Sequence, residues 1–437
     1  MTTAGSWDYW RILKSNRDFR NLWYGQVISE LGDWLNSIAI SMLVLQLGGG
    51  GLALAITMAA KLLPIFFVSP IAGVLTDRMD RRTILIVSDL LRFPVVLCFL
   101  WVDQPGELWL LYTLVVLEIA LAGFFEPARS ALIPSLTRRE DLVTANALSG
   151  STWSVMVALG AVLGGVVVSL FGLRTAFVVD AFTFLASAAC ILRIPRAGAP
   201  QPDPKQKEKS ILRDLTEAGQ YLKREPGILA LALLKSGLAI SGGIMTLIPL
   251  YAKSLYSASA AVSMGIGVLY SCRGVGAALG PPLVRRVFGD SSRVLRGSIA
   301  AAFFLGAAGH GIFALAETLI PAGLGIGLAT FFGSIIWVFS SALIHLEAED
   351  RFLGRIFSLE MALLTLVMGI SNFAVGWAVD VWGFTPQQSA MGISFLFLAP
   401  GLGWWVFLSR QQSRAEVAVA SVCPVEPSDA QVPPTSL

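Results

Sequence analysis

The sequence predicts an all-α integral membrane protein whose twelve transmembrane helices form two pseudo-symmetric six-helix bundles. Apolar residues make up 55% of the 437 positions and charged residues only 14%, whereas soluble domains carry roughly 25% charge. The mean hydropathy is +0.70, and the apolar residues gather in runs long enough to cross a bilayer, which takes about 20 residues per helix. This composition excludes a soluble enzyme, a disordered protein and a membrane β-barrel, whose strands alternate polar and apolar residues.

The individual spans are apolar runs separated by charged or turn-forming breaks. In the first half they cover residues 20–46, 52–75, 83–102, 107–126, 143–170 and 173–193, and in the second half residues 227–251, 260–284, 297–316, 318–345, 356–381 and 387–409. The chain is therefore predicted to consist of an N-terminal segment (1–19), a six-helix bundle (20–193), a linker (194–226), a second six-helix bundle (227–409) and a tail (410–437).

The breaks between the spans alternate between basic and nearly uncharged. Of the 32 Lys and Arg residues, 26 fall in segments on one side of the predicted membrane, while Arg174 and Lys253 alone fall on the other. Cytoplasmic loops carry an excess of Lys and Arg in membrane proteins. We therefore expect both termini and the linker to be cytoplasmic, in a multi-pass protein of the cell (inner or plasma) membrane.

The linker and the tail differ from the spans in composition. Ile211, Leu215, Ala218 and Leu222 recur at helical spacing among charged residues, which predicts an amphipathic helix on the cytoplasmic membrane surface. We expect this helix to join the two bundles structurally, with lipid sensing as the alternative. The tail is rich in Pro and Ser and is predicted to be disordered.

A short internal repeat supports the two-bundle prediction. The sequence Ser-Ala-Leu-Ile occurs at residues 130–133 and again at 341–344, in both cases at the cytoplasmic end of the fourth span of its half. Duplicated six-span halves are common in secondary transporters.

The loop between the second and third spans carries the most informative motif. Residues 73–82 read Gly-Val-Leu-Thr-Asp-Arg-Met-Asp-Arg-Arg, which resembles the signature loop of the major facilitator superfamily, Gly-x-x-x-Asp-Arg-x-x-Arg-Arg. Asp80 replaces the Gly usual before the last basic pair. Further stretches resemble the drug and siderophore exporter branch of macrolide-efflux and enterobactin-exporter-like proteins. These stretches are residues 19–23, 32–35, 125–128, 131–134, 145–148 and 354–355.

The resemblance implies the major facilitator fold and a role for this loop as a conformational latch between the two bundles. The latch residues are Gly73, Asp77, Arg78, Arg81 and Arg82. The resemblance implies that Asp77 caps the N-terminus of the eleventh span, where unpaired amides and the helix dipole favour an anion. Gly73 would allow close helix packing, and the arginines would pair with acids or lipid headgroups. The alternative is a basic loop that serves only membrane topology.

Acidic residues inside the spans predict the site of proton coupling. Charged groups at bilayer depth cost at least about 2.5–3.5 kcal/mol each on insertion scales, so they mark a pathway or a buried pair. Glu30 and Asp33 are one helical turn apart on the first span, which lines the central cavity in the superfamily, and Glu118 lies in the fourth span. We expect Asp33 above all, followed by Glu30 and Glu118, to carry the proton.

Other charged residues in the spans have competing explanations. Asp89 and Arg92 are predicted to form a structural pair within one helix, as residues three apart do. Asp180 is expected in a peripheral span, where a structural role is equally open, and His310 is expected to be a packed histidine. Glu360 and Asp380 are expected near the membrane interface, at the ends of the eleventh span.

The substrate cavity is predicted from basic and aromatic residues. Lys235 and Arg273 are the cations of the second-half spans, and they are expected either to bind an anionic substrate group or to pair with buried acids. Trp34, Phe124 and Trp337 offer apolar walls for a bulky ligand, although aromatic residues in spans also serve ordinary packing.

These features predict a secondary transporter, not an enzyme, that exports a small amphipathic compound such as a drug, macrolide or siderophore in exchange for protons by alternating access. A lipid or lysophospholipid flippase without obligatory proton coupling and a non-transporting membrane receptor or sensor are the alternatives. No Gly-x-x-x-x-Gly-Lys-Ser/Thr nucleotide-binding motif and no Cys or His spacing typical of metal sites occurs. We therefore expect no metal, no cofactor and no nucleic acid, with the small-molecule substrate, protons and membrane lipid as partners of a monomer.

Overall fold

The computed structural model describes residues 6–195 and 211–422, and the regular secondary structure of these residues is helical throughout. Eleven helical segments are long and apolar enough to cross a membrane. In hydrocarbon an α-helix satisfies its own backbone hydrogen bonds, which is why apolar runs of this length fold this way. The all-α membrane class predicted from composition is confirmed.

The N-terminal bundle contains five long helices, preceded by a short one. They are α1 (Ser6–Ser15), α2 (Arg17–Gln46), α3 (Gly51–Arg78), α4 (Arg81–Leu97), α5 (Leu108–Leu136) and α6 (Leu142–Leu192), with the 3-10 turns η1 (Cys98–Trp101) and η2 (Pro105–Glu107) between α4 and α5. The side chain of Asn16 accepts a hydrogen bond from the backbone amide of Phe19 (2.9 Å) and so caps the start of α2.

The C-terminal bundle follows the linker helix α7 (Ile211–Arg224). It consists of α8 (Pro226–Ala239), η3 (Ile240–Gly243), α9 (Ile244–Leu255), α10 (Ser259–Phe288), α11 (Ser292–Leu315), α12 (Leu319–Glu347), α13 (Asp350–Asp380) and α14 (Pro386–Val422). Helices α8 and α14 begin at a proline, whose missing amide costs nothing in the first turn. Helix α7 occupies the place of the predicted amphipathic helix, and Tyr221 stacks on Phe352 of α13 with 4.2 Å between ring centroids.

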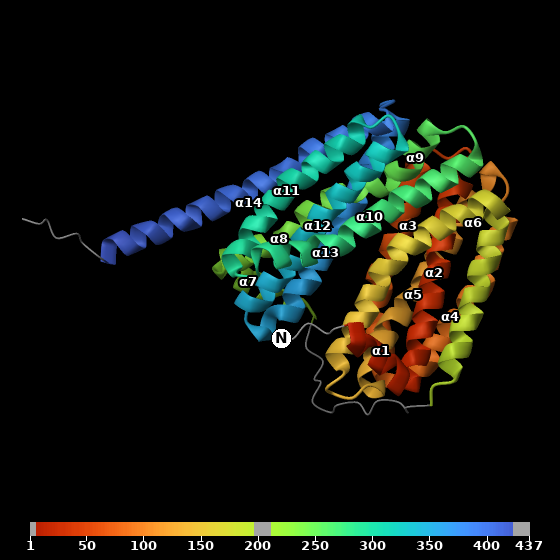
Figure 1. Ribbon diagram of the computed structural model, residues 1–437, viewed down its shortest axis with the longest axis horizontal. Helices are drawn as coiled ribbons and strands as arrows, with labels where there is room; N and C mark the ends of the chain where they lie inside the picture. The colour runs from red at the N-terminus through yellow and green to blue at the C-terminus, as the bar shows by residue number, and fades with distance from the viewer. Residues whose placement is uncertain (1–5, 196–210, 423–437) are drawn as a thin grey trace, which may run out of the picture.

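Helix α6 is 51 residues long and is interrupted at Gly172, whose φ of 83° is a conformation that favours glycine. The chain turns back at this point (Figure 1), and both limbs pack against α2. Gly164 of the first limb faces Ile38, whereas Gly25 of α2 faces Ser187 of the second limb. The interruption coincides with the boundary predicted between the fifth and sixth spans.

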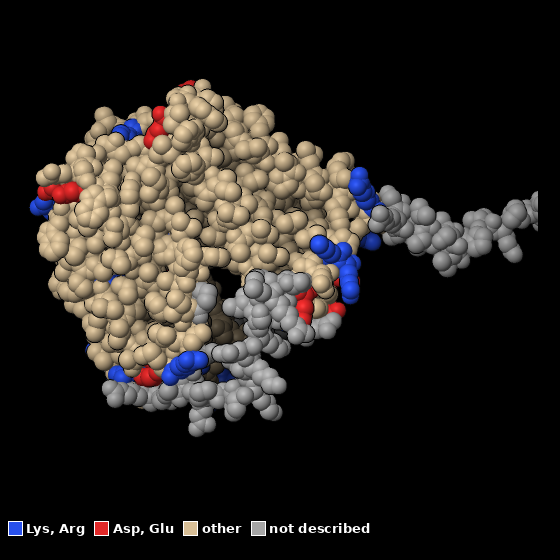
Figure 2. Space-filling view, turned by 180° about the vertical axis from the view of Figure 1, so that it is seen from behind, with Lys and Arg blue, Asp and Glu red and all other residues tan. Residues whose placement is uncertain are grey.

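The two bundles touch at one end and separate at the other (Figure 1). We call the end with the α3–α4, α5–α6, α10–α11 and α12–α13 connections and the linker the linker end, and the opposite one the far end. At the far end both bundles contribute to one hydrophobic core. Toward the linker end each bundle has its own core, and the molecule is hollowed between them (Figure 2).

Small residues bring the bundles together near the far end. A Cβ on Gly165 of α6 would lie 2.9 Å from the carbonyl oxygen of Ser263 in α10, and one on Gly267 would lie 2.6 Å from the carbonyl oxygen of Ala161. These distances are too short for any side chain, so backbone packs on backbone, as small residues allow in membranes. By contrast, a Cβ on Gly150, nearer the linker end of α6, would meet no atom within 4 Å.

The tail differs from its prediction. Disorder was expected from residue 410 onward, but α14 continues as a helix to Val422, so the prediction is wrong for residues 410–422. This stretch is rich in the helix formers Gln, Arg, Ala and Glu, and the prolines begin only at Pro424. Residues 423–437 lie outside the described part of the chain.

Candidate functional site

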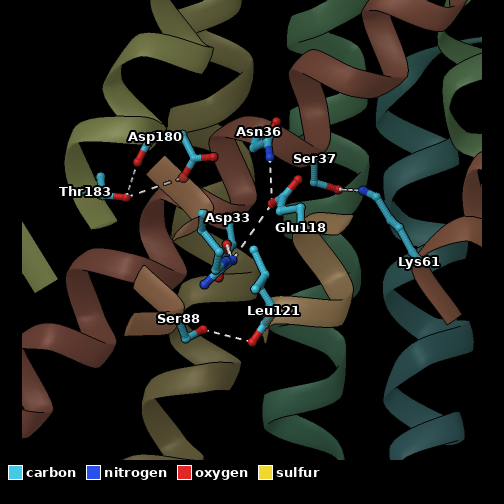
Figure 3. Close-up of polar contacts among 10 residues, drawn as sticks. Asp33, Asn36, Ser37, Lys61, Ser88, Glu118, Leu121, Asp180 and Thr183 are labelled. Carbon is cyan, nitrogen blue, oxygen red and sulfur yellow. Dashed lines mark hydrogen bonds and ion pairs between the residues drawn. The ribbon is translucent and has the colours of Figure 1, made fainter. Parts of the chain in front are cut away.

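A buried cluster of charged side chains lies inside the N-terminal bundle, between α2, α3, α4, α5 and the second limb of α6 (Figure 3). Its members are Asp33, Lys61, Asp89, Arg92, Glu118 and Asp180. Each of the five helices contributes at least one charged group, so the cluster links all five helices of this bundle.

Arg92 is the centre of the cluster. Its guanidinium donates a hydrogen bond to Asp33, lies 3.8 Å from Glu118 and stacks over the ring of Phe184 at 3.9 Å. It therefore bridges acids on α2 and α5. Asp89, predicted to pair with Arg92 on the same helix, feels the charge of Arg92 but forms no close hydrogen-bonded pair with it, and both of its carboxylate oxygens lack a hydrogen-bond partner. The long arginine side chain reaches acids on other helices, which spacing along one helix cannot reveal.

Two polar side chains of α2 extend the cluster. Asn36 donates a hydrogen bond to Glu118 (2.8 Å), and the ammonium group of Lys61 donates to the hydroxyl of Ser37 (2.8 Å). Helix α2 is thus tied to α3, α4 and α5 by hydrogen bonds or ion pairs. Asn36 and Ser37 were not predicted as site residues, because Asn and Ser within an apolar run give no signal of their own.

Asp89 and Asp180 lie within the electrostatic influence of Arg92 but form no direct ion pair with it. Both are fully buried, and one oxygen of Asp180 accepts only a weak hydrogen bond from the hydroxyl of Thr183 (3.4 Å) while the other accepts none. The cluster thus contains four carboxyl groups against the two cations Lys61 and Arg92. An isolated buried charge is very unfavourable, so the cluster approaches electrical neutrality when some of its carboxyl groups carry protons.

A cavity of about 80 Å³ opens beside the cluster. Its lining includes Glu30, Asp33, Arg92 and Glu126. The side chain of Asp33 is 37% exposed whereas that of Arg92 is 3% exposed, so Asp33 is where the cluster meets the cavity. Glu30 accepts a hydrogen bond from Gln26 (2.8 Å), and its second carboxylate oxygen is buried without a partner.

Behind this cavity, Arg129 organises a second set of polar contacts. It pairs with Glu126 (2.7 Å) and donates hydrogen bonds to Gln26 and Ser149. Neither Arg129 nor Glu126 was predicted, although Glu126 belongs to the Phe-Glu-Pro-Ala stretch that resembles exporters. The position of Glu126 in that stretch is the sequence feature that could have identified it as a site residue.

The C-terminal bundle holds a separate buried ion pair. Lys235 of α8 lies 2.7 Å from Glu360 of α13 and 2.7 Å from the hydroxyl of Ser341, with its ammonium group 4.6 Å from the ring centroid of Trp337. Glu360, expected near the membrane interface, has a side chain that is fully buried inside the protein. The ammonium group of Lys235 is engaged in this ion pair, so it is not available to bind a substrate in this conformation.

The remaining cavity candidates lie apart from one another. Trp34 packs against Tyr270 of α10 with ring centroids 5.7 Å apart, at the contact between the bundles. Arg273 lies one helical turn after Tyr270 on α10 and is half-buried. Phe124 instead lines a different, apolar cavity of about 210 Å³ between α3, α4 and α5, and Trp337 belongs to the Lys235 site.

The loop after α3 holds the N-terminal bundle together at its linker end. Arg81 donates to the carbonyl of Ala131 (2.7 Å), and Arg82 donates to that of Leu192 (2.7 Å). Arg78 is exposed. A Cβ on Gly73 would meet no atom within 4 Å, so the close helix approach expected there is not present in this conformation. The side chain of Asp77 lies outside the described part of the structure.

Comparison with known proteins agrees with this architecture. Residues 11–418 match the family described as transmembrane secretion effector. The chain is 23% identical over 369 residues to macrolide efflux protein A of Streptococcus pyogenes, covering 80% of this chain and 87% of that protein. It is 29% identical over 220 residues to the uncharacterized MFS-type transporter YfiS of Bacillus subtilis, and this match spans about half of each protein (50% and 52%).

Solved transporters share the fold. The nucleoside transporter NupG superposes with a TM-score of 0.68 at 12% identity, covering 90% of this chain and 99% of NupG. At this identity the likeness concerns the fold alone.

Proposed function

Because the chain belongs to the transmembrane secretion effector family of major facilitator transporters, we propose that it is a proton-coupled exporter of a small amphipathic compound. The observation that carries the proposal is the surplus of buried carboxyl groups over cations around Arg92. A buried site of this composition favours the uptake of protons, and it meets the cavity at Asp33.

Arg92 supplies a means of coupling. Its guanidinium contacts both Asp33 on α2 and Glu118 on α5. Protonation of Asp33 removes one of the two charges that hold Arg92, and the guanidinium then turns fully toward Glu118. Charge-assisted hydrogen bonds are stronger than neutral ones, so this exchange loosens α2 from α4 and tightens α4 against α5. A local proton transfer thereby changes helix packing in the bundle.

The proposed topology has twelve spans, with the two limbs of α6 counted as separate crossings, and a cytoplasmic linker end. The 26-to-2 distribution of Lys and Arg supports this orientation. The cavity beside Asp33 then faces the cytoplasm in this conformation, where an exporter collects its substrate. Alternating access would close this end and open the far end.

Transport into everted membrane vesicles tests the proposal. Radiolabelled erythromycin is the first probe, chosen because a relative is named as a macrolide efflux protein, and a panel of fluorescent amphipathic dyes follows it. We expect uptake that stops when an uncoupler removes the proton gradient. Asp33→Asn should abolish the gradient-dependent part, whereas Asp103→Asn, which changes an exposed loop acid, should leave it unchanged. Uptake that persists with the uncoupler would contradict proton coupling and favour a flippase.

A further inference from the structure

Asp380, the last residue of α13, contacts the other bundle at the far end. One of its carboxylate oxygens accepts a hydrogen bond from the backbone amide of Gly51 and the other from that of Leu52, both at 2.7 Å. These amides belong to the first turn of α3 and have no partner within their own helix. The residue preceding that turn, Gly50, has no side chain to cap it. A carboxylate from the C-terminal bundle therefore supplies the cap of a helix in the N-terminal bundle.

The contact is built for close approach. A Cβ on Gly50 would lie 2.8 Å from an oxygen of Asp380, and one on Gly376 would lie 2.6 Å from the carbonyl oxygen of Gly51. A side chain at Gly376 would push α3 and α13 apart, and one at Gly50 would displace the carboxylate of Asp380. The sequence has four consecutive glycines at residues 48–51. The last two, Gly50 and Gly51, lie where α13 docks against α3.

Helix dipoles make this contact directional. A carboxylate is favoured at a helix N-terminus and disfavoured at a C-terminus. Asp380 stands at the C-terminus of its own helix, so its charge is well placed only while α3 is docked against it. Helices α3 and α13 are antiparallel, and the sequence puts Asp77 correspondingly near the C-terminal end of α3, toward the start of α13.

We propose that Asp380 is a gate residue that holds the far end closed by capping α3, and that its release accompanies opening toward the far side. This inference rests on the proposed alternating access. The Asp380 contact at the far end is formed in this conformation, with both of its carboxylate oxygens on amides of the first turn of α3.

Spin-label distance measurements in lipid nanodiscs test this gate without any substrate. The labels go on Asp103→Cys and Glu317→Cys, exposed far-end positions of the two bundles, after the four native cysteines are replaced. Wild type should show mainly the short distance. Asp380→Asn should increase the population of longer distances about two- to fivefold, the effect expected for loss of a charge at a helix terminus. Asp380→Glu should restore part of the short-distance population, whereas Asp290→Asn, an exposed linker-end change, should not alter it.

Gly376→Ala provides a second, independent variant. It keeps the carboxylate but prevents the close approach, and it should lengthen the same distance. An unchanged distribution in both Asp380→Asn and Gly376→Ala would overturn the proposal. Because the readout needs neither substrate nor protons, absence of erythromycin or dye uptake in wild type would refute the proposed function while leaving a shifted distance in Asp380→Asn intact.

Discussion

At the scale of single residues, the pairing of buried charges differs between the two bundles. In the N-terminal bundle Arg92 is shared between Asp33 and Glu118, with further acids nearby that form no direct ion pair. In the C-terminal bundle Lys235 and Glu360 form one closed pair. A surplus of acids leaves room for a titrating proton, whereas a balanced pair does not. The proposed proton coupling therefore involves the first bundle, and we expect a structural role for the pair in the second.

The Lys235–Glu360 pair makes a prediction about stability. Lys235→Met or Glu360→Met alone should lower the free energy of unfolding by about 3–5 kcal/mol, because each leaves an uncompensated buried charge. The double variant should recover most of that loss, since an apolar pair of similar size buries no charge. Thermal unfolding in detergent measures both effects. Equal destabilisation by the single and double variants would show that the pair is not closed in the way described.

The charged residues of the site could be singled out from the sequence, but the residues with which they pair could not. Charged residues inside apolar runs are conspicuous, so Asp33, Glu118 and Arg92 could be singled out as unusual. The partners depend on side chains meeting across helices, and the spacing of Asp89 and Arg92 suggested a pair that Arg92 does not form. The position of Glu360 near the start of its predicted span gives no sign of its buried partner Lys235, because the contact depends on how α13, which begins at Asp350, packs against α8.

At the scale of helices, the contact between α6 and α10 determines how closely the bundles approach. Gly165 and Gly267 face each other across this contact, and a Cβ on Gly165 would lie 3.2 Å from the Cα of Gly267. Because the backbones of α6 and α10 touch directly, this contact forms or separates as a unit. Small residues at such crossings suit surfaces that must part and rejoin during transport.

A large side chain at the contact between α6 and α10 should shift the equilibrium from a closed toward an open far end. Gly165→Leu is expected to separate the bundles at the far end, because its side chain would collide with the α10 backbone, and to lengthen the spin-label distance defined above. Gly150→Leu, on the same helix where a Cβ meets no atom, should leave that distance unchanged. A short distance retained in a folded Gly165→Leu protein would contradict the role given to this crossing.

Helix boundaries were largely predictable because bilayer-length apolar runs and the breaks between them determine where helices can begin and end. The structure nevertheless extends several helices at the linker end, such as α5, which continues to Leu136, where residue 126 was expected as the end of the span. Polar and charged residues in these extensions are tolerated because they lie beyond hydrocarbon or face the opening between the bundles. Hydropathy alone cannot distinguish such extensions from loops.

At the scale of the whole molecule, the distribution of hydrophobic cores explains its open shape. One core spans both bundles at the far end, whereas the linker-end cores are separate. Helices in a bilayer associate through van der Waals packing and interhelical hydrogen bonds, so the packing of the shared core and the Asp380 contact together favour closure of the far end. The linker end has the hollow and the cavity beside Asp33.

The orientation of this shape in the membrane gives the last prediction. In a background without native cysteines, Asp103→Cys at the far end should react with a membrane-impermeant maleimide in intact cells. Arg139→Cys, exposed at the linker end, should react only in everted vesicles, because 26 of the 32 Lys and Arg residues fall in segments of that end, which predicts a cytoplasmic location. Glu126→Cys, in the cavity lining, should follow Arg139→Cys, because the hollow opens to the same side. Labelling after detergent permeabilisation controls for reactivity, and the reverse pattern would place the cavity on the outer side and contradict export from the cytoplasm in this conformation.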